Sequence, residues 1–384
     1  MPPGSNTPID FFSTPKTASL HKLGLLAKYL KPLTWKWGSG WRNIWIVDGF
    51  AGSGAYETGE PGSPRVAAVW AREEELRRGN PLLRCINVER DPTCFEHLQR
   101  NLAPWKDLVT NLSGGFADHL DEILRRIGHD PAFFFLDPFG VNGIEMEVIE
   151  KVFHRQNSKT EILLHFSDKS FKRMAGHSDE SDGRSSVAVK LGESKLARLD
   201  SVIGTRLWRP RWEGDVPDTD AAMEATAELY LSQLRERGIR YAVQIRVRDD
   251  WEARPRYRLV FCTGSPHGVE LMSDIACDYE RSLWDAGHEG TFDLLLAEEA
   301  RKRGDGALRD LIHEAGLSAG TASRQEIIHT LVPRLFGRYR TSDYAKAIRQ
   351  LVQQGGIKRA SWKGIEDSEP LEFVAPTQQS LLGS

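Results

Sequence analysis

Short apolar runs alternate with segments of helical periodicity from residue 44 onward, and this alternation constrains the fold more than any other feature. The expected strands are 44–48, 82–88, 107–111, 132–136 and 160–166. The helices expected between them are 63–78, 92–103, 117–127 and 143–154. Strand and helix in turn at this spacing are typical of a parallel sheet with helices on both faces. The sequence therefore predicts a doubly wound α/β fold.

The pattern changes at the end of this region. Tyr241–Val247 and Tyr257–Cys262 are rich in β-forming residues, and the link D-D-W-E-A-R-P between them is too short for a crossover helix. We expect the two runs to pair antiparallel. One antiparallel hairpin at the end of a mostly parallel sheet is the arrangement of the Rossmann-like class I methyltransferase fold, in which the last strand is inserted beside the fifth.

Two further segments surround this core. Leucines at helical spacing predict an amphipathic helix over 17–30, with Pro32 just beyond it. An insertion at about 174–220 contains a helix-compatible stretch, 186–198, and the aromatic and basic run L-W-R-P-R-W at 207–212. Such an insertion usually caps the active site or contacts the substrate, and the alternative is a mobile surface loop.

After about residue 285 the chain reads as helices without intervening strands. These helices are expected at 290–303, 306–315, 323–335 and 341–354, and two short strands separated by a polar turn follow them. This order resembles a winged helix-turn-helix. We therefore expect two domains, a Rossmann-like domain at 1–285 and a winged helix-turn-helix-like domain at 286–384.

Composition narrows the classes of function. The formal charge of −3 argues against a chain that binds nucleic acid over its whole surface, so any such binding must be local. The four cysteines are too widely spaced for a C-x-x-C metal pattern, and the histidines form no H-E-x-x-H motif, so we expect no metal site. No apolar stretch is long enough to span a membrane and no secretory signal is visible, which favours a cytoplasmic protein without a membrane partner.

The first strand runs into a glycine-rich turn, and Ile44–Gly54 reads I-W-I-V-D-G-F-A-G-S-G. Glycines after a buried strand let the backbone approach a ligand closely. S-adenosylmethionine suits this turn, whereas a nicotinamide fingerprint spaces its glycines differently and a phosphate loop needs G-K-[ST]. A plain structural turn is the alternative. The expected cofactor contacts in this turn are Asp48, Gly49, Phe50, Ala51, Gly52 and Gly54.

The next two strand ends supply further candidate contacts. Glu89 ends the second strand, where a carboxylate can accept both ribose hydroxyls, unless it is simply a solvated acid. After the third strand, Phe116 offers apolar contact to adenine and Asp118 an acceptor for its exocyclic amine. Asp118 can equally be a cap of the helix that follows.

The fourth strand ends in F-F-F-L-D-P-F-G, which places Asp137 at the edge of the sheet where ligands bind in open α/β folds. The sequence D-P-F-G resembles the D-P-P-Y type of motif in amino-methyltransferases. In that motif an acid or amide and the carbonyl beside proline accept hydrogen bonds from an exocyclic amine, and the aromatic residue stacks on the substrate. Asp137, Pro138 and Phe139 are therefore the candidate catalytic residues. The alternative is a strand end closed by a turn, with Phe139 in the core.

Two other groups of side chains have a possible role. His165, at the end of the fifth strand, either lines the site or is a satisfied strand-end residue. Residues 323–384 contain nine Lys and Arg against six acids, opposite in sign to the whole chain. Nucleic-acid contacts are expected at Lys346, Arg349, Lys358, Arg359 and Lys363. Winged helices also dock proteins, so nucleic-acid binding and protein docking both stay open as roles for this region.

Four segments together resemble the three-Cys-motif partner family, TcmP. They are K-T-A-S-L-H-K-L-G-L-L-A-K-Y-L, I-V-D-G-F-A-G-S-G-A-Y with G-E-P-G-S-P, F-L-D-P-F-G, and L-V-F-C-T-G-S-P-H-G-V-E-L-M. The resemblance spans about residues 11–280. It implies a methyltransferase-like fold, cofactor contacts at Asp48, Gly49, Gly52 and Gly54, and a radical-S-adenosylmethionine-like three-Cys-motif protein as partner.

Three hypotheses follow. The first is an S-adenosylmethionine-dependent methyltransferase acting on an exocyclic amine of a nucleobase or nucleic acid. The second is a cofactor-binding partner or scaffold that transfers no methyl group. The third is a DNA-binding regulator that acts through the winged helix.

Overall fold

The computed structural model describes residues 18–56, 59–155, 159–176, 193–213, 218–287, 291–358 and 366–375. The chain divides into two compact units, Met1–Ser265 and Pro266–Ser384. Helix α9 (Pro266–Gly287) belongs to the second unit because it packs against the later helix α11 (Arg324–Leu331). The division therefore falls earlier than the boundary at residue 285 that composition suggested.

Unit 1 is built on one seven-stranded sheet with the order β3-β2-β1-β4-β5-β7-β6. The strands are β1 (Ile44–Asp48), β2 (Leu83–Glu89), β3 (Val109–Ser113), β4 (Ala132–Leu136), β5 (Thr160–Phe166), β6 (Tyr241–Val247) and β7 (Tyr257–Thr263). Strands β1 to β5 are parallel, and β7 runs antiparallel to both β5 and β6. This confirms the mostly parallel sheet, with its last strand inserted beside the fifth.

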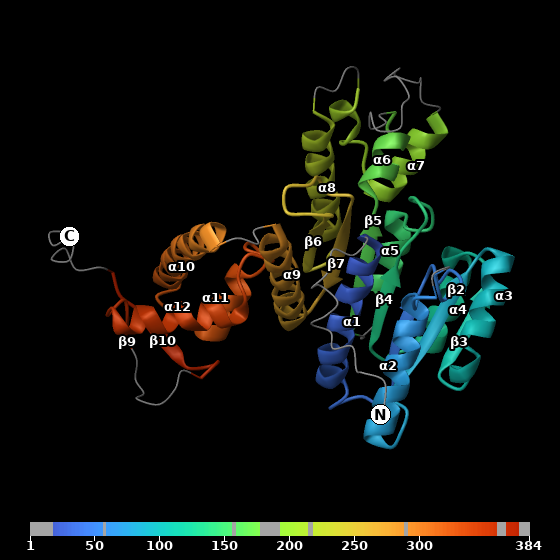
Figure 1. Ribbon diagram of the computed structural model, residues 1–384, viewed down its shortest axis with the longest axis horizontal. Coiled ribbons are helices and arrows are strands. Elements are labelled where there is room, and N and C mark those ends of the chain that lie inside the picture. The colour runs from blue at the N-terminus through green and yellow to red at the C-terminus, as the bar shows by residue number, and fades with distance from the viewer. Residues whose placement is uncertain are drawn as a thin grey trace. The chain divides into compact units, whose positions relative to one another are not determined.

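Helices cover both faces of this sheet (Figure 1). They are α1 (Ala18–Trp37), α2 (Ser63–Arg78), α3 (Pro92–Asn101), α4 (Phe116–Ile127), α5 (Met146–Phe153), α6 (Asp168–Met174), α7 (Glu193–Ile203) and α8 (Thr219–Glu236). Alternate residues of a strand point to opposite faces. Phe134 of β4 belongs to the core cluster formed with α4, α5, α7 and α8, whereas Phe133 contacts Tyr29 of α1 at 5.5 Å between ring centroids. Burial on both faces explains why β4 reads as an unbroken apolar run.

One expectation about unit 1 is wrong, and so is one of the two alternatives left open for its insertion. Helix α1 continues through Pro32 to Trp37, because burial of the Leu33 and Trp37 side chains stabilises the turns beyond the proline. Residues 193–213, the longest described stretch of the insertion, are not a mobile surface loop. Trp208 and Trp212 are buried, and both pack against Phe171 of α6. Burial of these large rings outweighs the exposure that their basic neighbours suggest.

The described part of unit 2 consists of helices and one small sheet. Its elements are α9, α10 (Thr291–Ala319), β8 (Thr321–Ser323), α11, α12 (Thr341–Gln353), β9 (Ile357–Lys358) and β10 (Pro370–Phe373). The antiparallel sheet has the order β8-β10-β9. The two helices expected at 290–303 and 306–315 are the single helix α10. A helical glycine costs about 1 kcal/mol, and packing of α10 against α12 and the Tyr339 hydroxyl bond to the Gly304 carbonyl (3.2 Å) offset that cost.

No helix within the described ranges is long and apolar enough to cross a membrane.

Candidate functional site at the carboxyl edge of the sheet

Three acids predicted from the sequence lie at the same edge of the unit 1 sheet. Asp48 is the last residue of β1, Glu89 is the last residue of β2, and Asp137 directly follows β4. Asp48 is in register with Asn87 on one side and with Phe135 on the other. Because these neighbouring strands are parallel, their carboxyl ends meet and bring the three acids into one region.

The glycine turn after β1 is fixed by both neighbouring strands. The Gly49 amide donates to the Phe135 carbonyl (3.0 Å), and the Ala51 amide donates to the Val88 carbonyl (2.9 Å). A Cβ at Gly49 would lie 2.7 Å from Cδ2 of Leu136, so this glycine is needed for packing. Gly52 has φ +59°, and a Cβ there would meet no atom within 4 Å among the described residues. Gly49 therefore serves the core, whereas Gly52 faces open space where a ligand can approach.

Asp48 has an unusual electrostatic environment. Its Oδ1 accepts a hydrogen bond from the Phe50 amide at 3.1 Å. Within the described part of the chain, its buried Oδ2 has no aligned hydrogen-bond partner. Burial raises the pKa of Asp48 from 3.8 to about 7, although the Ser63 side chain and the Phe50 amide lower it. A buried carboxyl oxygen of this kind is a group that a bound polar ligand would satisfy.

Glu89 is held in place by the backbone. Its Oε2 accepts from the Gly52 amide and its Oε1 from the Asp91 amide, both at 2.7 Å. Each carboxylate oxygen can accept a second hydrogen bond. The acid is therefore oriented at the turn with acceptor capacity left for a diol.

The two expected adenine contacts differ in exposure. Phe116 is buried and packs between Phe50 (6.0 Å between centroids) and Phe134 (6.4 Å) beneath the glycine turn. Asp118 is exposed in the first turn of α4, where the helix dipole favours an acid. The structure thus places Phe116 in the core. The N-cap of α4 is Gly115 and no side chain makes a capping hydrogen bond there, so the alternative that Asp118 caps the helix is wrong, and its contact with adenine stays a prediction.

Asp137 is the centre of a charged cluster. Lys22, from the start of α1, forms an ion pair with Asp137 Oδ2, and the two side chains are 10% and 25% exposed. Nδ1 of His165 lies 3.1 Å from Asp137 Oδ1 without the alignment of a hydrogen bond. We call Lys22, Asp137 and His165 the edge cluster. It presents a carboxylate held between a cation and an imidazole.

Tyr257, the first residue of β7, completes the surroundings of His165. The two rings meet edge to face, with 4.5 Å between centroids, and the Lys22 ammonium lies 5.9 Å from the centroid of the tyrosine ring. Burial lowers the pKa of His165 to about 4, even though Asp137 raises it. His165 is therefore a neutral imidazole at pH 7.

The residues after Asp137 point in different directions. Pro138 is buried, whereas Phe139 is fully exposed. The alternative that Phe139 belongs to the core is wrong. An aromatic ring in water beside the edge cluster is available to stack on a flat ligand.

Sequence reasoning found Asp137 but missed Lys22 and Tyr257. Lys22 lies in a helix that was expected only to pack, and no motif marks it. Tyr257 begins a strand that runs opposite to its neighbours, which is why its first residue reaches the same edge as the last residues of β1 and β4. The predicted antiparallel direction of the strand at 257–262 was the one signal that could have placed Tyr257 at this edge.

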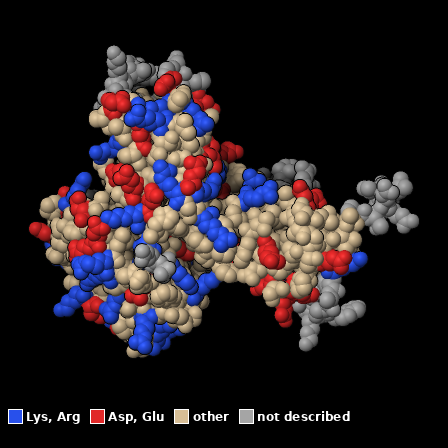
Figure 2. All heavy atoms as spheres, turned by 180° about the vertical axis from the view of Figure 1, so that it is seen from behind, with Lys and Arg blue, Asp and Glu red and all other residues tan. Residues whose placement is uncertain are grey.

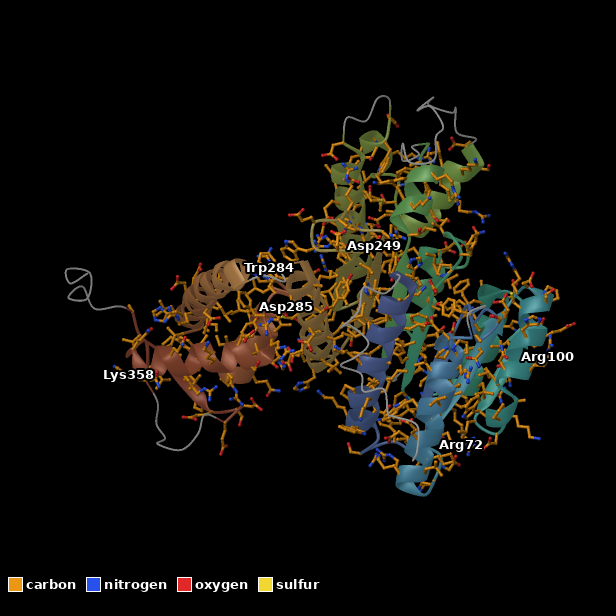
Figure 3. The ribbon with its side chains drawn as sticks, viewed as in Figure 1. Arg72, Arg100, Asp249, Trp284, Asp285 and Lys358 are labelled. Carbon is orange, nitrogen blue, oxygen red and sulfur yellow. The ribbon has the colours of Figure 1, made fainter. Side chains whose placement is uncertain are left out.

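The basic residues predicted in unit 2 are only partly described. Lys346 and Arg349 are exposed on one face of α12, and Lys346 pairs with Asp305 at 2.8 Å. Lys358 is exposed on β9 (Figure 3). Arg359 and Lys363 lie outside the described residues. Three of the five predicted cations are thus located.

No protein-family model matches the chain. One curated protein, ribosomal RNA small subunit methyltransferase H of Thermobifida fusca (strain YX), is 31% identical over 80 residues. That match covers 21% of this chain and 24% of the relative, so the chain spans about a quarter of the relative's length.

The solved structures to which the chain shows some similarity include two described as O-methyltransferases. The one from Bacillus cereus, in complex with SAH, has a TM-score of 0.32 and 16% identity, covering 62% of this chain and 80% of that one. The putative enzyme from Klebsiella pneumoniae has a TM-score of 0.33 and 12% identity, covering 69% and 93%. The structure of DszA carbon methyltransferase has a TM-score of 0.35 and 12% identity, covering 63% and 53%. Likenesses of this size do not fix an activity.

Proposed function

We propose that this chain is an S-adenosylmethionine-dependent methyltransferase that acts on an exocyclic amine of a nucleobase or nucleic acid. The observation that carries the proposal is the position of the edge cluster. A carboxylate, Asp137, stands at the carboxyl edge of the sheet beside a glycine turn, and an exposed aromatic ring, Phe139, follows it. Ligands bind at this edge in open α/β sheets.

The residues around the glycine turn fit the cofactor. Glu89, oriented by two backbone amides, would accept from the ribose hydroxyls. Gly52 leaves room for close approach, and the buried Oδ2 of Asp48 would gain a donor from the amino end of the ligand. When bound, the cofactor supplies a methyl group on a positively charged sulfur.

The residues of the edge cluster would bind and orient the acceptor. Asp137 accepts a hydrogen bond from the exocyclic amine, which directs the nitrogen lone pair and increases its electron density. Lys22 fixes one carboxylate oxygen, so the other is presented in a defined direction. His165 is neutral and adds no charge that would oppose a positively charged methyl donor. Phe139 stacks on the base.

Turnover and cofactor binding test this proposal separately. Asp137→Ala should abolish methyl transfer from radiolabelled S-adenosylmethionine to DNA and RNA, while calorimetry shows cofactor affinity close to that of the wild type. Glu89→Ala should weaken cofactor binding itself. Asp121→Ala is the matched control, because Asp121 is an exposed acid on α4 paired only with Lys151 (2.6 Å) in the described structure. Methylation by Asp137→Ala at the wild-type rate would show that the assignment of Asp137 is wrong.

We further propose that unit 2 is a winged helix that recruits the nucleic acid. The order α10, β8, α11, α12, β9, β10 and the three-stranded antiparallel sheet support this. Lys346 and Arg349 on α12 would contact phosphates, with Lys358 on the wing. Acidic and basic side chains are interspersed over the face seen in Figure 2, so binding would depend on such local cations rather than on overall charge. The affinity of the full chain for DNA should fall steeply with salt, and less steeply in Arg349→Ala.

The TcmP-like motifs support a second candidate, a cofactor-binding partner of a radical-S-adenosylmethionine-like three-Cys-motif protein. In this second candidate Gly52 and Asp48 would still bind the cofactor at the glycine turn, but no methyl group would be transferred. Calorimetry and turnover distinguish the two candidates. Cofactor binding without methyl transfer to any nucleic acid favours the partner role, and failure to bind the cofactor argues against both.

A further inference from the structure

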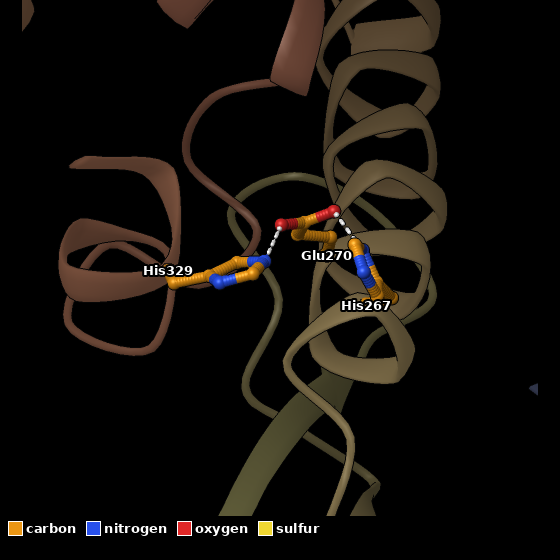
Figure 4. Close-up of side chains that lie close together, drawn as sticks. All are labelled: His267, Glu270 and His329. Carbon is orange, nitrogen blue, oxygen red and sulfur yellow. Dashed lines mark hydrogen bonds and ion pairs between the residues drawn. The ribbon is translucent and has the colours of Figure 1, made fainter. Parts of the chain in front are cut away.

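Three metal-ligating side chains converge in unit 2, far from the edge cluster in sequence. His267 and Glu270 lie one turn apart on α9, and His329 comes from α11. Glu270 lies between the two imidazoles (Figure 4). Its Oε1 is 2.7 Å from His329 Nε2, and its Oε2 is 3.3 Å from His267 Nδ1. One ligand atom from each residue lies within 4.8 Å of the others.

Contacts elsewhere on α9 hold this arrangement. The Ser273 hydroxyl accepts from the Gly337 amide at 3.0 Å, and Asp274 accepts from both the amide and the hydroxyl of Thr341 at 2.7 Å. These bonds tie α9 to the chain that follows α11. The three side chains are therefore brought together by the fold, so a ligand would meet a largely formed site.

Gln325 provides an outer contact. Its amide nitrogen lies 3.2 Å from Nε2 of His267, the ring atom opposite the one that faces Glu270. Amide oxygen and nitrogen are interchangeable assignments at such a contact. With the amide turned over, its oxygen would accept from Nε2–H and leave Nδ1 as the metal ligand. Metal-binding histidines usually donate their other ring N–H to an acceptor of this kind.

The chemistry of the three donors selects a class of ion. Two neutral imidazoles and one carboxylate carry a charge of −1, which suits a divalent cation. Nitrogen donors favour Zn²⁺ and its transition-metal neighbours over Mg²⁺ and Ca²⁺, which prefer oxygen. The side chains of His267, Glu270 and His329 are 38%, 18% and 23% exposed, so solvent can supply a further ligand.

We propose that His267, Glu270 and His329 form a binding site for a divalent transition-metal ion of the Zn²⁺ type, which joins α9 to α11. Sequence reasoning predicted no metal site because H-G-V-E at 267–270 is not a recognised metal motif and the third donor is supplied by a distant helix. The proposal is independent of the proposed methyltransferase activity.

Metal titration of the full-length protein tests the site. After treatment with a chelator, the protein should bind one equivalent of Co²⁺ with a visible absorption band, and Zn²⁺ should displace it. His329→Asn and Glu270→Gln keep polar groups of similar size and should each lose the band and weaken Zn²⁺ binding at least tenfold. His97→Ala, which removes an exposed histidine of α3, is the matched control and should bind as the wild type does.

Gln325→Ala keeps the proposal testable should a ligand variant fail to fold. Loss of the outer contact should weaken Zn²⁺ binding roughly 10- to 100-fold while circular dichroism is unchanged. Zn²⁺ should also raise the melting temperature of the wild type more than that of Gln325→Ala. Equal Zn²⁺ affinity in the wild type, Glu270→Gln and Gln325→Ala would overturn the proposal and leave Glu270 as an ordinary hydrogen-bonded acid between two histidines.

Discussion

Phe139 is the side chain at the carboxyl edge that packing explains least. It is fully exposed, whereas Pro138 before it is buried. An exposed phenylalanine contributes little to stability, because its ring stays in water when the chain folds. Its position after Asp137 instead gives the edge a flat apolar surface next to a hydrogen-bond acceptor.

Replacing Phe139 should therefore separate binding from folding. We expect Phe139→Ala to change the free energy of unfolding by less than about 0.5 kcal/mol. Binding of the nucleobase that accepts the methyl group should weaken by roughly 1–3 kcal/mol, the usual contribution of stacking on a base. Chemical denaturation and acceptor titration measure the two effects. Leu76→Ala, at an exposed leucine of α2, is the control and should alter neither.

Lys22 orients Asp137 from a different element of the structure. We expect Lys22→Ala to lower kcat roughly 10²-fold, because a small displacement of a catalytic group costs about that much, while cofactor affinity changes little. Lys22→Arg should restore part of the rate by keeping the cation. Steady-state kinetics with both variants measures this. Equal rates for Lys22→Ala and the wild type would mean that the ion pair only stabilises the fold.

Asp137, Lys22 and Phe139 show how far the sequence can predict the site. Asp137 was predictable because a polar residue after an unbroken apolar strand must lie at the sheet edge. Lys22 was not, since nothing local in a helix specifies which strand end one of its side chains will reach. Phe139 was ambiguous for a similar reason, because a turn residue can point either inward or to water.

At the scale of elements, buried strands were the easiest to predict. The ranges of β1, β4, β5 and β6 match the expectation, because strands buried on most positions read as continuous apolar runs. The tryptophans at 208 and 212 and the unbroken helix α10 were harder, because in each case distant packing overrides local composition. The glycine turn after β1 contains one glycine required by core packing, Gly49, and one that faces open space, Gly52.

Two glycine variants in this turn should behave differently. In Gly49→Ala the new methyl would lie 2.7 Å from Leu136 Cδ2 and 3.0 Å from Phe116 Cδ2, so we expect a loss of about 1–3 kcal/mol of stability. In Gly52→Ala there is room for the methyl, but φ +59° costs about 1–2 kcal/mol. Gly52→Ala should also lose cofactor affinity, because its methyl would occupy the open space through which the ligand approaches the turn. Denaturation and calorimetry on both variants measure the contrast, and a Gly52→Ala protein with unchanged cofactor affinity would remove Gly52 from the site.

At the scale of the whole molecule, buried ionisable groups make stability depend on pH. His165 has a pKa of about 4 in the folded protein and about 6.5 when unfolded, so between these values the unfolded chain binds the extra proton. The contribution of His165 to the free energy of unfolding therefore falls as pH drops from about 6.5 to 4, and it is constant above pH 6.5. The loss is at most about 3 kcal/mol.

Comparing His165→Gln with the wild type isolates this effect. The stability difference between them should be flat above pH 7 and should shift in favour of the variant as pH falls towards 4, as measured by urea denaturation. Glu161 provides a control of opposite sign. Burial raises its pKa to about 7, so its contribution is lost as pH rises from about 4.5 to 7, and Glu161→Gln should remove that slope. A His165→Gln difference that does not vary with pH would contradict the burial of a neutral imidazole.

The insertion of β7 between β5 and β6 also affects how the protein is made. During synthesis β5 is complete at Phe166, but the strand that covers its free edge ends at Thr263, about 100 residues later. At roughly 5–20 residues per second, the ribosome leaves that edge without its partner for about 5–20 s. An apolar strand with unpaired backbone groups is a template for pairing with other chains. The nascent protein thus passes through a period of vulnerability to aggregation that ends only when β7 emerges.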